Sequence, residues 1–400
     1  MKFALLSHKL PPSSSGQAVV IQRILRDLDP GDYCLISPER YDSTDEGPTE
    51  RLQAKYYYLP PPSRIKRGHR FGLLHLREGV NIPLAIWQHA RVLTDIIRRE
   101  RCEAVVACTG DVTLLPAAYL ASRRARVPFY AYLFDHYSYR EWSDPAASFW
   151  ARRVEPRLMK GAAAVIAPNE VLRDDLRSHF QIEAAVIYNP LDITPYEETV
   201  KLHSALGEAE DGEIKIVYTG AIYEAHYDAF RNLMAAIESL RRPNVRLHLY
   251  SNTPLEELAA LGISGPLIRH PHRAASEMPR IQMEADILFL PLAFESPYPD
   301  LVRTSATTKL GEYLAARRPV LVHAPRDSFV SWYFREHDCG VVVDESDPAL
   351  LAAGLARLLD DEELRSRQGT NAWTRAHADF AVEKSRQTFA RLVGLNGGQS

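Results

Sequence analysis

The chain is poor in cysteine and has no long apolar run, and both features limit the classes of protein to which it can belong. Its four cysteines form no C-x-x-C pair and no zinc-binding spacing, which favours reduced thiols in a cytosolic setting. No apolar stretch approaches the roughly 18 residues that a membrane-spanning helix needs. The apolar run at the start is too short for a secretory signal. We therefore expect a cytoplasmic protein.

A strong charge of one sign and the common dinucleotide motif are also absent. The chain has 48 Lys and Arg against 51 Asp and Glu, so its net charge of −3 gives no general attraction to nucleic acid. No G-x-G-x-x-G sequence occurs, which argues against an NAD-dependent enzyme. With 400 residues, of which 46% are apolar, the chain is long enough for two or three globular domains.

Short apolar runs alternate with helical segments along nearly the whole chain. This α/β pattern predicts parallel sheets covered by helices on both faces. The runs fall into two sets, so we predict two Rossmann-like, doubly wound domains. The first set of strands covers residues 2–7, 33–37, 55–59, 103–108, 128–133, 162–167 and 184–188, and the second covers 214–219, 245–250, 266–270, 286–290, 319–323 and 340–343.

A polar, charged stretch that two prolines interrupt separates the two sets of strands, which is typical of a connection between domains. A ligand cleft between the two domains is the expected binding site. The predicted boundaries are residues 1–192 for the first domain, 193–212 for the linker, 213–375 for the second domain, and 376–400 for a C-terminal helix that packs back on the first domain.

The most informative motif is a predicted helix that follows the buried strand at 286–290 in the second domain. Thr308, Lys309 and Glu312 lie three or four residues apart, so they share one helical face. In open parallel sheets, the amino end of such a helix lies beside the carboxyl ends of the strands, where its free N–H groups attract phosphate. Lys309 for a phosphate and Glu312 for ribose hydroxyls would suit a nucleotide diphosphate. A surface Lys–Glu pair on an amphipathic helix is the simpler alternative.

Taken together, several segments of the chain resemble the GT-B glycosyltransferases, in particular the large retaining family 4 (group 1). The likeness extends over nearly the whole chain and is strongest from 213 to 345. Glu312 falls where that family places the second Glu of its E-x7-E motif, which holds the ribose. Four segments carry the resemblance. Residues 276–280 precede a strand, residues 308–315 form the donor helix, and residues 165–169 and 186–192 are the two loop segments that close the first domain.

The resemblance implies a transferase that moves a sugar from a nucleotide-diphosphate sugar to a hydroxyl group. The acceptor would be a glycan, a lipid-linked molecule or a small molecule, and the reaction would proceed with retention and without a metal or other cofactor. The other glycosyltransferase fold uses a D-x-D metal site. It is disfavoured because Asp27 and Asp29 end a predicted helix rather than a strand. A nucleotide-sugar epimerase of the same fold and a non-catalytic nucleotide-sugar-binding partner remain as alternatives.

Three positions depart from the family pattern. Thr304 stands where the first Glu of E-x7-E is expected. Ala221 stands where an arginine often follows the glycine of the first loop, and His226 stands at the downstream lysine position. Two usual diphosphate cations are therefore missing. Lys309 becomes the main candidate for that role. Either other cations such as Arg273 or Arg303 replace the missing ones, or the donor differs.

Two glycines add to the predicted donor site, because close approach of a backbone to a diphosphate requires a residue without Cβ. Gly16 follows the first strand of the first domain, and Gly220 follows the first strand of the second. A plain turn explains Gly16 equally well. The full set of predicted donor-binding residues is Gly16, Gly220, His270, Arg273, Thr307, Thr308, Lys309 and Glu312.

Polar residues after the strand at 128–133 are predicted to face the acceptor. His136 could position or deprotonate an acceptor hydroxyl, and Asp135 could orient that imidazole or stabilise positive charge on the donor sugar. With Lys309, they form the predicted catalytic set. A helix-capping role is the alternative for His136, as it is for Asp111. The predicted acceptor-side residues are Asp111, His136, Tyr137 and Arg140.

Basic and apolar residues interleave between residues 64 and 77. Such a segment can contact an anionic membrane or a lipid-linked acceptor, which would place the enzyme at the inner face of the membrane. It could equally be a loop that recognises a soluble acceptor.

Overall fold

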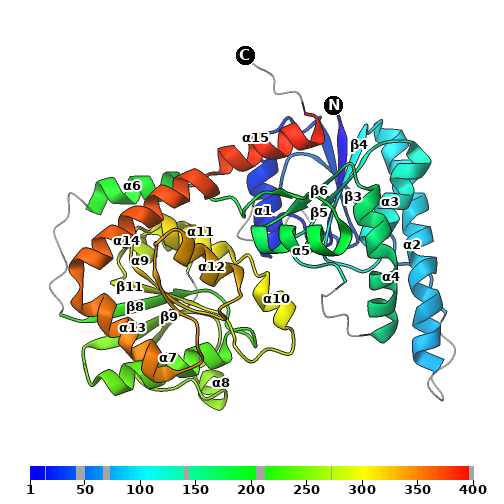
Figure 1. Ribbon diagram of the computed structural model, residues 1–400. Coiled ribbons are helices and arrows are strands. Elements are labelled where there is room, and N and C mark those ends of the chain that lie inside the picture. The colour runs from blue at the N-terminus through cyan, green and yellow to red at the C-terminus, as the bar shows by residue number, and fades with distance from the viewer. Residues whose placement is uncertain are drawn as a thin grey trace. The chain divides into compact units, whose positions relative to one another are not determined.

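The computed structural model describes residues 1–13, 15–41, 50–65, 73–138, 144–203, 212–271 and 273–395. The chain divides into two compact units, which are described separately (Figure 1). Unit 1 comprises Met1–Tyr188 together with Glu383–Ser400, and unit 2 comprises Asn189–Val382. The chain therefore returns to unit 1 for its last helix.

Unit 1 is built on a parallel sheet with the strand order β3-β2-β1-β4-β5-β6-β7. Its strands are β1 (Phe3–Leu6), β2 (Tyr33–Ser37), β3 (Lys55–Tyr58), β4 (Ala104–Cys108), β5 (Phe129–Tyr132), β6 (Ala164–Ala167) and β7 (Ala185–Val186). Its helices are α1 (Gly16–Leu25), α2 (Leu73–Glu100), α3 (Leu114–Ala125), α4 (Pro145–Gly161), α5 (Glu170–Phe180) and α15 (Val382–Val393).

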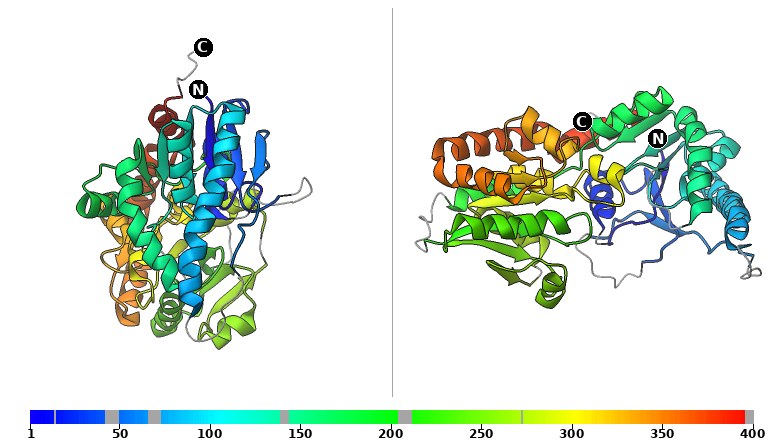
Figure 2. Two further views of the ribbon diagram at one scale, coloured as in Figure 1. Left: turned by 90° about the vertical axis from the view of Figure 1, so that its right-hand side faces the viewer. Right: turned by 60° about the horizontal axis from the view of Figure 1, so that its bottom comes forward.

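The central strands of unit 1 are apolar on both faces because helices cover both sides of the sheet. Ala4 and Leu6 belong to a core that also contains residues of α2, α3, α4 and α5. Phe3 and Leu5 point the other way, into a core shared with α1 and α15. Phe389 of α15 contacts Phe3 edge-on at 5.8 Å between ring centroids. Figure 2 shows the long helix α2, in light blue, lying along this sheet.

Unit 2 is built on a parallel sheet with the strand order β10-β9-β8-β11-β12-β13. Its strands are β8 (Ile214–Thr219), β9 (Val245–Tyr250), β10 (Leu267–His270), β11 (Ile287–Pro291), β12 (Val320–His323) and β13 (Val341–Val343). Its helical segments are α6 (Thr194–His203), α7 (Tyr227–Leu240), α8 (Leu255–Ala260), η1 (Ala275–Glu277), α9 (Met278–Met283), α10 (Pro299–Arg303), α11 (Thr308–Ala315), α12 (Phe329–Glu336), α13 (Pro348–Asp360), α14 (Glu362–Arg375) and the π-helical turn η2 (Ala376–Phe380).

The two faces of the unit 2 sheet differ in chemistry. Tyr218 and Leu249 face an apolar core formed with helices α7 and α13. Because side chains alternate along a strand, Thr219 and Tyr250 face the opposite side, where α9 and α11 lie (Figure 1). This second face carries the polar groups of the candidate donor site.

The two predicted sets of strands are confirmed, since every predicted segment contains a strand of the expected sheet. Part of the predicted linker, residues 193–212, is helix α6. The segments by which the chain enters and leaves unit 2 lie side by side, because Leu191 and Ala381 form a parallel bridge. Among the described residues, no helix is both long and apolar enough to cross a membrane.

Candidate functional site

The amino end of helix α11 is fixed by a capping residue. Thr307 has an extended backbone, and its side-chain oxygen accepts from the N–H of Lys309 at 3.4 Å, as an N-cap residue does. The apolar face of the helix, including Leu310 and Leu314, is buried. Thr308, Lys309 and Glu312 therefore remain half-buried on the polar face, at the positive end of the helix dipole.

Lys309 lies directly over Gly220, the residue that follows β8. Gly220 has a φ of +125°, and a Cβ built on it would lie 2.7 Å from Cε and 2.9 Å from Nζ of Lys309. Only glycine permits both this backbone conformation and this close approach. The ammonium group also lies 5.2 Å from the ring centroid of Tyr218. The fold thus places a cation at the carboxyl end of β8, beside the amino end of α11.

The carboxylate of Glu312 is oriented by a buried glutamine. Gln282 of α9 donates from Nε2 to Oε2 of Glu312 at 3.3 Å and to Oγ1 of Thr219 at 3.1 Å. The hydroxyl of Tyr196 donates to Oε1 of Gln282 at 2.7 Å, so the amide orientation is fixed at both ends. Gln282 is fully buried and was not among the predicted site residues. Its only signal in the sequence is a polar residue inside a short apolar helix.

In unit 1, the predicted acceptor-side residues come from the ends of two neighbouring strands, β4 and β5. His136 is 4% exposed, and its Nε2 lies 2.8 Å from Oδ2 of Asp175 on α5. An acceptor hydroxyl cannot reach Nε2 without displacing that carboxylate. Tyr137 is buried and donates to the carbonyl of Val112 at 2.5 Å, while Asp135 is half-buried. Arg140 lies outside the described residues.

The remaining unit 1 candidates lie near the carboxyl ends of β1 and β4. Gly16 is the exposed first residue of α1, and the side chain of Ser15 caps that helix by accepting from Ala18 N at 3.2 Å. Asp111 accepts from both the N–H and the hydroxyl of Thr113, at 2.7 and 2.5 Å. Local hydrogen bonds therefore account for the present position of Asp111.

Two family models match the chain. The description "Glycosyltransferase Family 4" applies to residues 15–194, and "Glycosyl transferases group 1" applies to residues 213–361. The chain belongs to the GT-B glycosyltransferases. The two matches follow the division into two parallel-sheet units, one for each half of this glycosyltransferase.

Solved structures show the same fold over the whole chain. HepE of Anabaena, in complex with UDP, is 16% identical with a TM-score of 0.68, and the match covers 99% of this glycosyltransferase and 100% of HepE. A glycosyltransferase from Rickettsia africae is 12% identical with a TM-score of 0.69, covering 100% and 99%. Sucrose-phosphate synthase of Thermosynechococcus elongatus is 12% identical with a TM-score of 0.68, covering 99% and 98%. A search of curated proteins finds no match.

This glycosyltransferase replaces one expected cation with a neutral histidine. His226 is 5% exposed, and burial, reinforced by the nearby charge of Lys309, lowers its pKa to about 3. The imidazole is therefore uncharged at neutral pH. Within the part of the chain that the structure describes, its buried Nδ1 has no hydrogen-bond partner. Lys309 thus remains the main cation at the end of β8.

Thr304 and the two arginines considered as replacement cations have local partners. Thr304 is buried, and its hydroxyl donates to the carbonyl of Asp300 at 2.8 Å, so it closes helix α10. Arg303 lies 3.8 Å from Asp300, and Arg273 lies 3.9 Å from Glu277. Each arginine proposed as a replacement cation thus already faces a carboxylate.

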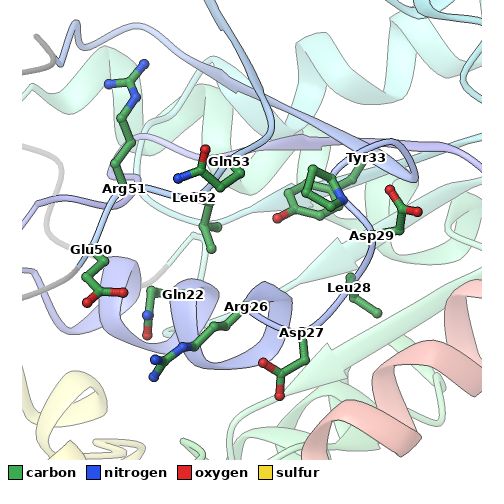
Figure 3. Close-up of a pocket in the computed structure, with 11 residues that line it drawn as sticks. Gln22, Arg26, Asp27, Leu28, Asp29, Tyr33, Glu50, Arg51, Leu52 and Gln53 are labelled. Atoms are coloured by element: carbon green, nitrogen blue, oxygen red, sulfur yellow. The ribbon is translucent and has the colours of Figure 1, made fainter.

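A cavity of about 610 Å³ in unit 1 lies away from these residues (Figure 3). Its lining residues precede β2 and β3, except Tyr33, which begins β2, so it opens at the amino ends of these strands. Ligands of open parallel sheets bind at the opposite, carboxyl edge. The cavity is lined by Gln22, Arg26, Asp27, Leu28, Asp29, Pro30, Tyr33, Glu50, Arg51, Leu52 and Gln53. We therefore do not assign the donor or the acceptor to it.

Proposed function

We propose that this glycosyltransferase uses a nucleotide-diphosphate sugar as donor and binds it to unit 2 at the amino end of α11. The observation that carries the proposal is the position of Lys309 over Gly220, one helical turn from the oriented carboxylate of Glu312. The spacing suits a diphosphate at Lys309 and a ribose at Glu312. Thr307 and Thr308 add hydroxyls at the helix end. His270, which ends β10, and Arg273, which follows it, would lie on the side of the base.

The leaving diphosphate gains negative charge as the bond to the sugar breaks, and fixed positive groups lower the cost of that charge. We assign this role to Lys309 and the positive end of the α11 helix dipole, since the N–H of Gly220 is already donated to the carbonyl of Tyr250. We propose further that transfer proceeds with retention and requires no metal. Solved structures of HepE contain UDP, UDP-glucose, or UDP with glucose, which supports a uridine nucleotide as the first donor to test.

We propose that the acceptor binds unit 1 through a hydroxyl group, near Asp111, His136 and Tyr137 and the segment that contains Arg140. The acceptor is a glycan, a lipid-linked molecule or a small molecule. For a lipid-linked acceptor, the basic segment 64–77 would contact the cytoplasmic face of a membrane. Residues 66–72 of that segment lie outside the described part of the chain.

The first test is a thermal-shift screen with UDP, GDP and their sugars. A ligand at 100 times its Kd adds about 2.7 kcal/mol of stability, which raises the melting temperature of a unit of this size by roughly 2–4 °C or more. We expect such a shift with at least one nucleotide, in buffer with or without EDTA. Failure of every nucleotide would contradict the proposed donor site.

Turnover distinguishes the transferase from its alternatives. A transferase consumes the donor faster when an acceptor is supplied, and the rate is unchanged by EDTA if no metal takes part. An epimerase would convert the sugar nucleotide with no acceptor present. A non-catalytic binding partner would show the thermal shift and no turnover under any condition.

We propose that a bound acceptor displaces Asp175 from Nε2 of His136. Replacing His136 by alanine is then expected to spare donor binding and to slow transfer by about 100-fold, the lower end of the range for a positioned acid–base group. Asp175→Asn should give a smaller loss in the same direction, because the amide still occupies the position beside Nε2. The exposed His179 on the same helix serves as the control. Donor affinity is measured by calorimetry and transfer by release of the nucleotide diphosphate. Full transfer activity of His136→Ala would show that this histidine only supports the fold.

A further inference from the structure

Three rings lie together on the polar face of the unit 2 sheet. His270, at the end of β10, stacks on Tyr250 of β9 with ring centroids 4.3 Å apart and planes inclined by 12°. His248 of β9 lies edge to edge with His270, with ring centroids 5.2 Å apart and planes inclined by 22°. The carbonyl of Tyr250 accepts from the N–H of Gly220 at 2.9 Å. The three rings therefore reach the same sheet edge as the candidate diphosphate site.

The two histidines are linked to a carboxylate. Nε2 of His270 lies 3.1 Å from Nδ1 of His248. Nε2 of His248 in turn lies 3.3 Å from Oε2 of Glu213, although the two groups do not form a regular hydrogen bond. Burial lowers the pKa of both histidines, so both are neutral at neutral pH. Each ring then carries a single proton, on one of its two nitrogens.

This chain of contacts determines where each proton lies. The carboxylate of Glu213 favours the proton of His248 on Nε2, because the alternative would place two lone pairs against each other. Nδ1 of His248 is then an acceptor, so His270 carries its proton on Nε2 and donates it to His248. The remaining nitrogen of His270, Nδ1, is consequently a hydrogen-bond acceptor.

We propose that Nδ1 of His270 reads the base of the donor nucleotide by accepting a ring N–H. This inference rests on the proposed donor site. Uracil and guanine present a ring N–H on their pairing edge, whereas cytosine and adenine present a lone pair at the corresponding nitrogen. A site built to accept a proton rejects a base that cannot supply it, because two acceptors are then left facing each other.

The same sheet face also holds the ribose group of the site. Tyr250 and Thr219 occupy paired positions on β9 and β8, so their side chains lie on one face. Thr219 is joined to Glu312 through Gln282. A nucleotide whose ribose is held by Glu312 and whose diphosphate is held by Lys309 would therefore extend its base along this face, towards the end of β10.

The test compares UDP, GDP, CDP and ADP by isothermal titration in the wild type and in Glu213→Gln. We expect the wild type to bind UDP or GDP about tenfold or more tightly than CDP and ADP. A glutamine can present either an N–H or a carbonyl to His248, so it no longer fixes the tautomers. The preference should then fall about fivefold or more, with weaker UDP or GDP binding and stronger CDP or ADP binding. Glu256→Gln, an exposed substitution on α8, should leave the ratio unchanged.

A second variant, His270→Phe, retains the stack on Tyr250 and removes the acceptor, so it should also lose the preference. Equal binding of all four nucleotides by the wild type, or an unchanged preference in both variants, would overturn the role of His270 and leave the donor site intact. If the wild type bound none of the four nucleotides, the proposed donor site would fail, and this inference would fail with it.

Discussion

Replacing Lys309 by methionine is expected to weaken binding of a nucleoside diphosphate by at least about tenfold without unfolding the enzyme. A unit charge about 4 Å from a phosphate contributes about 4 kcal/mol at an effective dielectric constant near 20. A smaller net loss is expected, because the half-buried ammonium is partly hydrated in the free enzyme. The effect should still be large, because this glycosyltransferase has Ala221 and the neutral His226 where its relatives often have cations.

Calorimetric titration with UDP, together with the melting temperature without ligand, measures the effect of Lys309→Met. Lys160→Met removes an exposed lysine of α4 and controls for the change in net charge. Gly220→Ala is an independent check, because the added Cβ would displace Nζ of Lys309 and strain a backbone with a φ of +125°. If Lys309→Met bound UDP as the wild type does, the diphosphate would have to be placed elsewhere.

Much of the fold could be predicted from the sequence because its signals are local. A buried parallel strand is a short apolar run, and both domains contain such runs separated by helical segments. Helix α11 was predicted for the same reason, because the spacing of Thr308, Lys309 and Glu312 is a property of one short segment. Helix α6 was missed inside the predicted linker because that segment is charged and contains prolines, which resembles a loop.

The contacts that orient the site side chains could not be predicted, because they join residues far apart in the sequence. Gln282 holds Glu312 from 30 positions away, and Asp175 holds His136 from 39 positions away. Neither partner has a local pattern that indicates its role. The contacts depend on which helices pack on which face of the sheet, and periodicity alone does not specify this.

The acid sensitivity of unit 2 should depend strongly on His226. Its pKa is lowered to about 3 in the folded chain, against about 6.5 when it is exposed in the unfolded chain. Between these values the unfolded state binds a proton that the folded state excludes, so stability falls as the pH falls from about 6.5 towards 3. By this linkage, the histidine alone should reduce stability by roughly 3 kcal/mol between pH 7.5 and pH 4.

The variant His226→Asn removes the titrating group and places a favourable N-cap residue before α7, where His226 makes no side-chain cap hydrogen bond. We expect its melting temperature to fall several degrees less than that of the wild type between pH 7.5 and pH 4. The buried His323 also has a lowered pKa and is present in both proteins, so the difference between them isolates His226. If the melting temperatures of the two proteins fell in parallel with pH, the burial of a neutral imidazole at this position would be contradicted.

A diphosphate bound at Lys309 would bring negative charge near His226 and raise its pKa. Saturating UDP should therefore reduce the acid sensitivity of the wild type and leave that of the variant nearly unchanged.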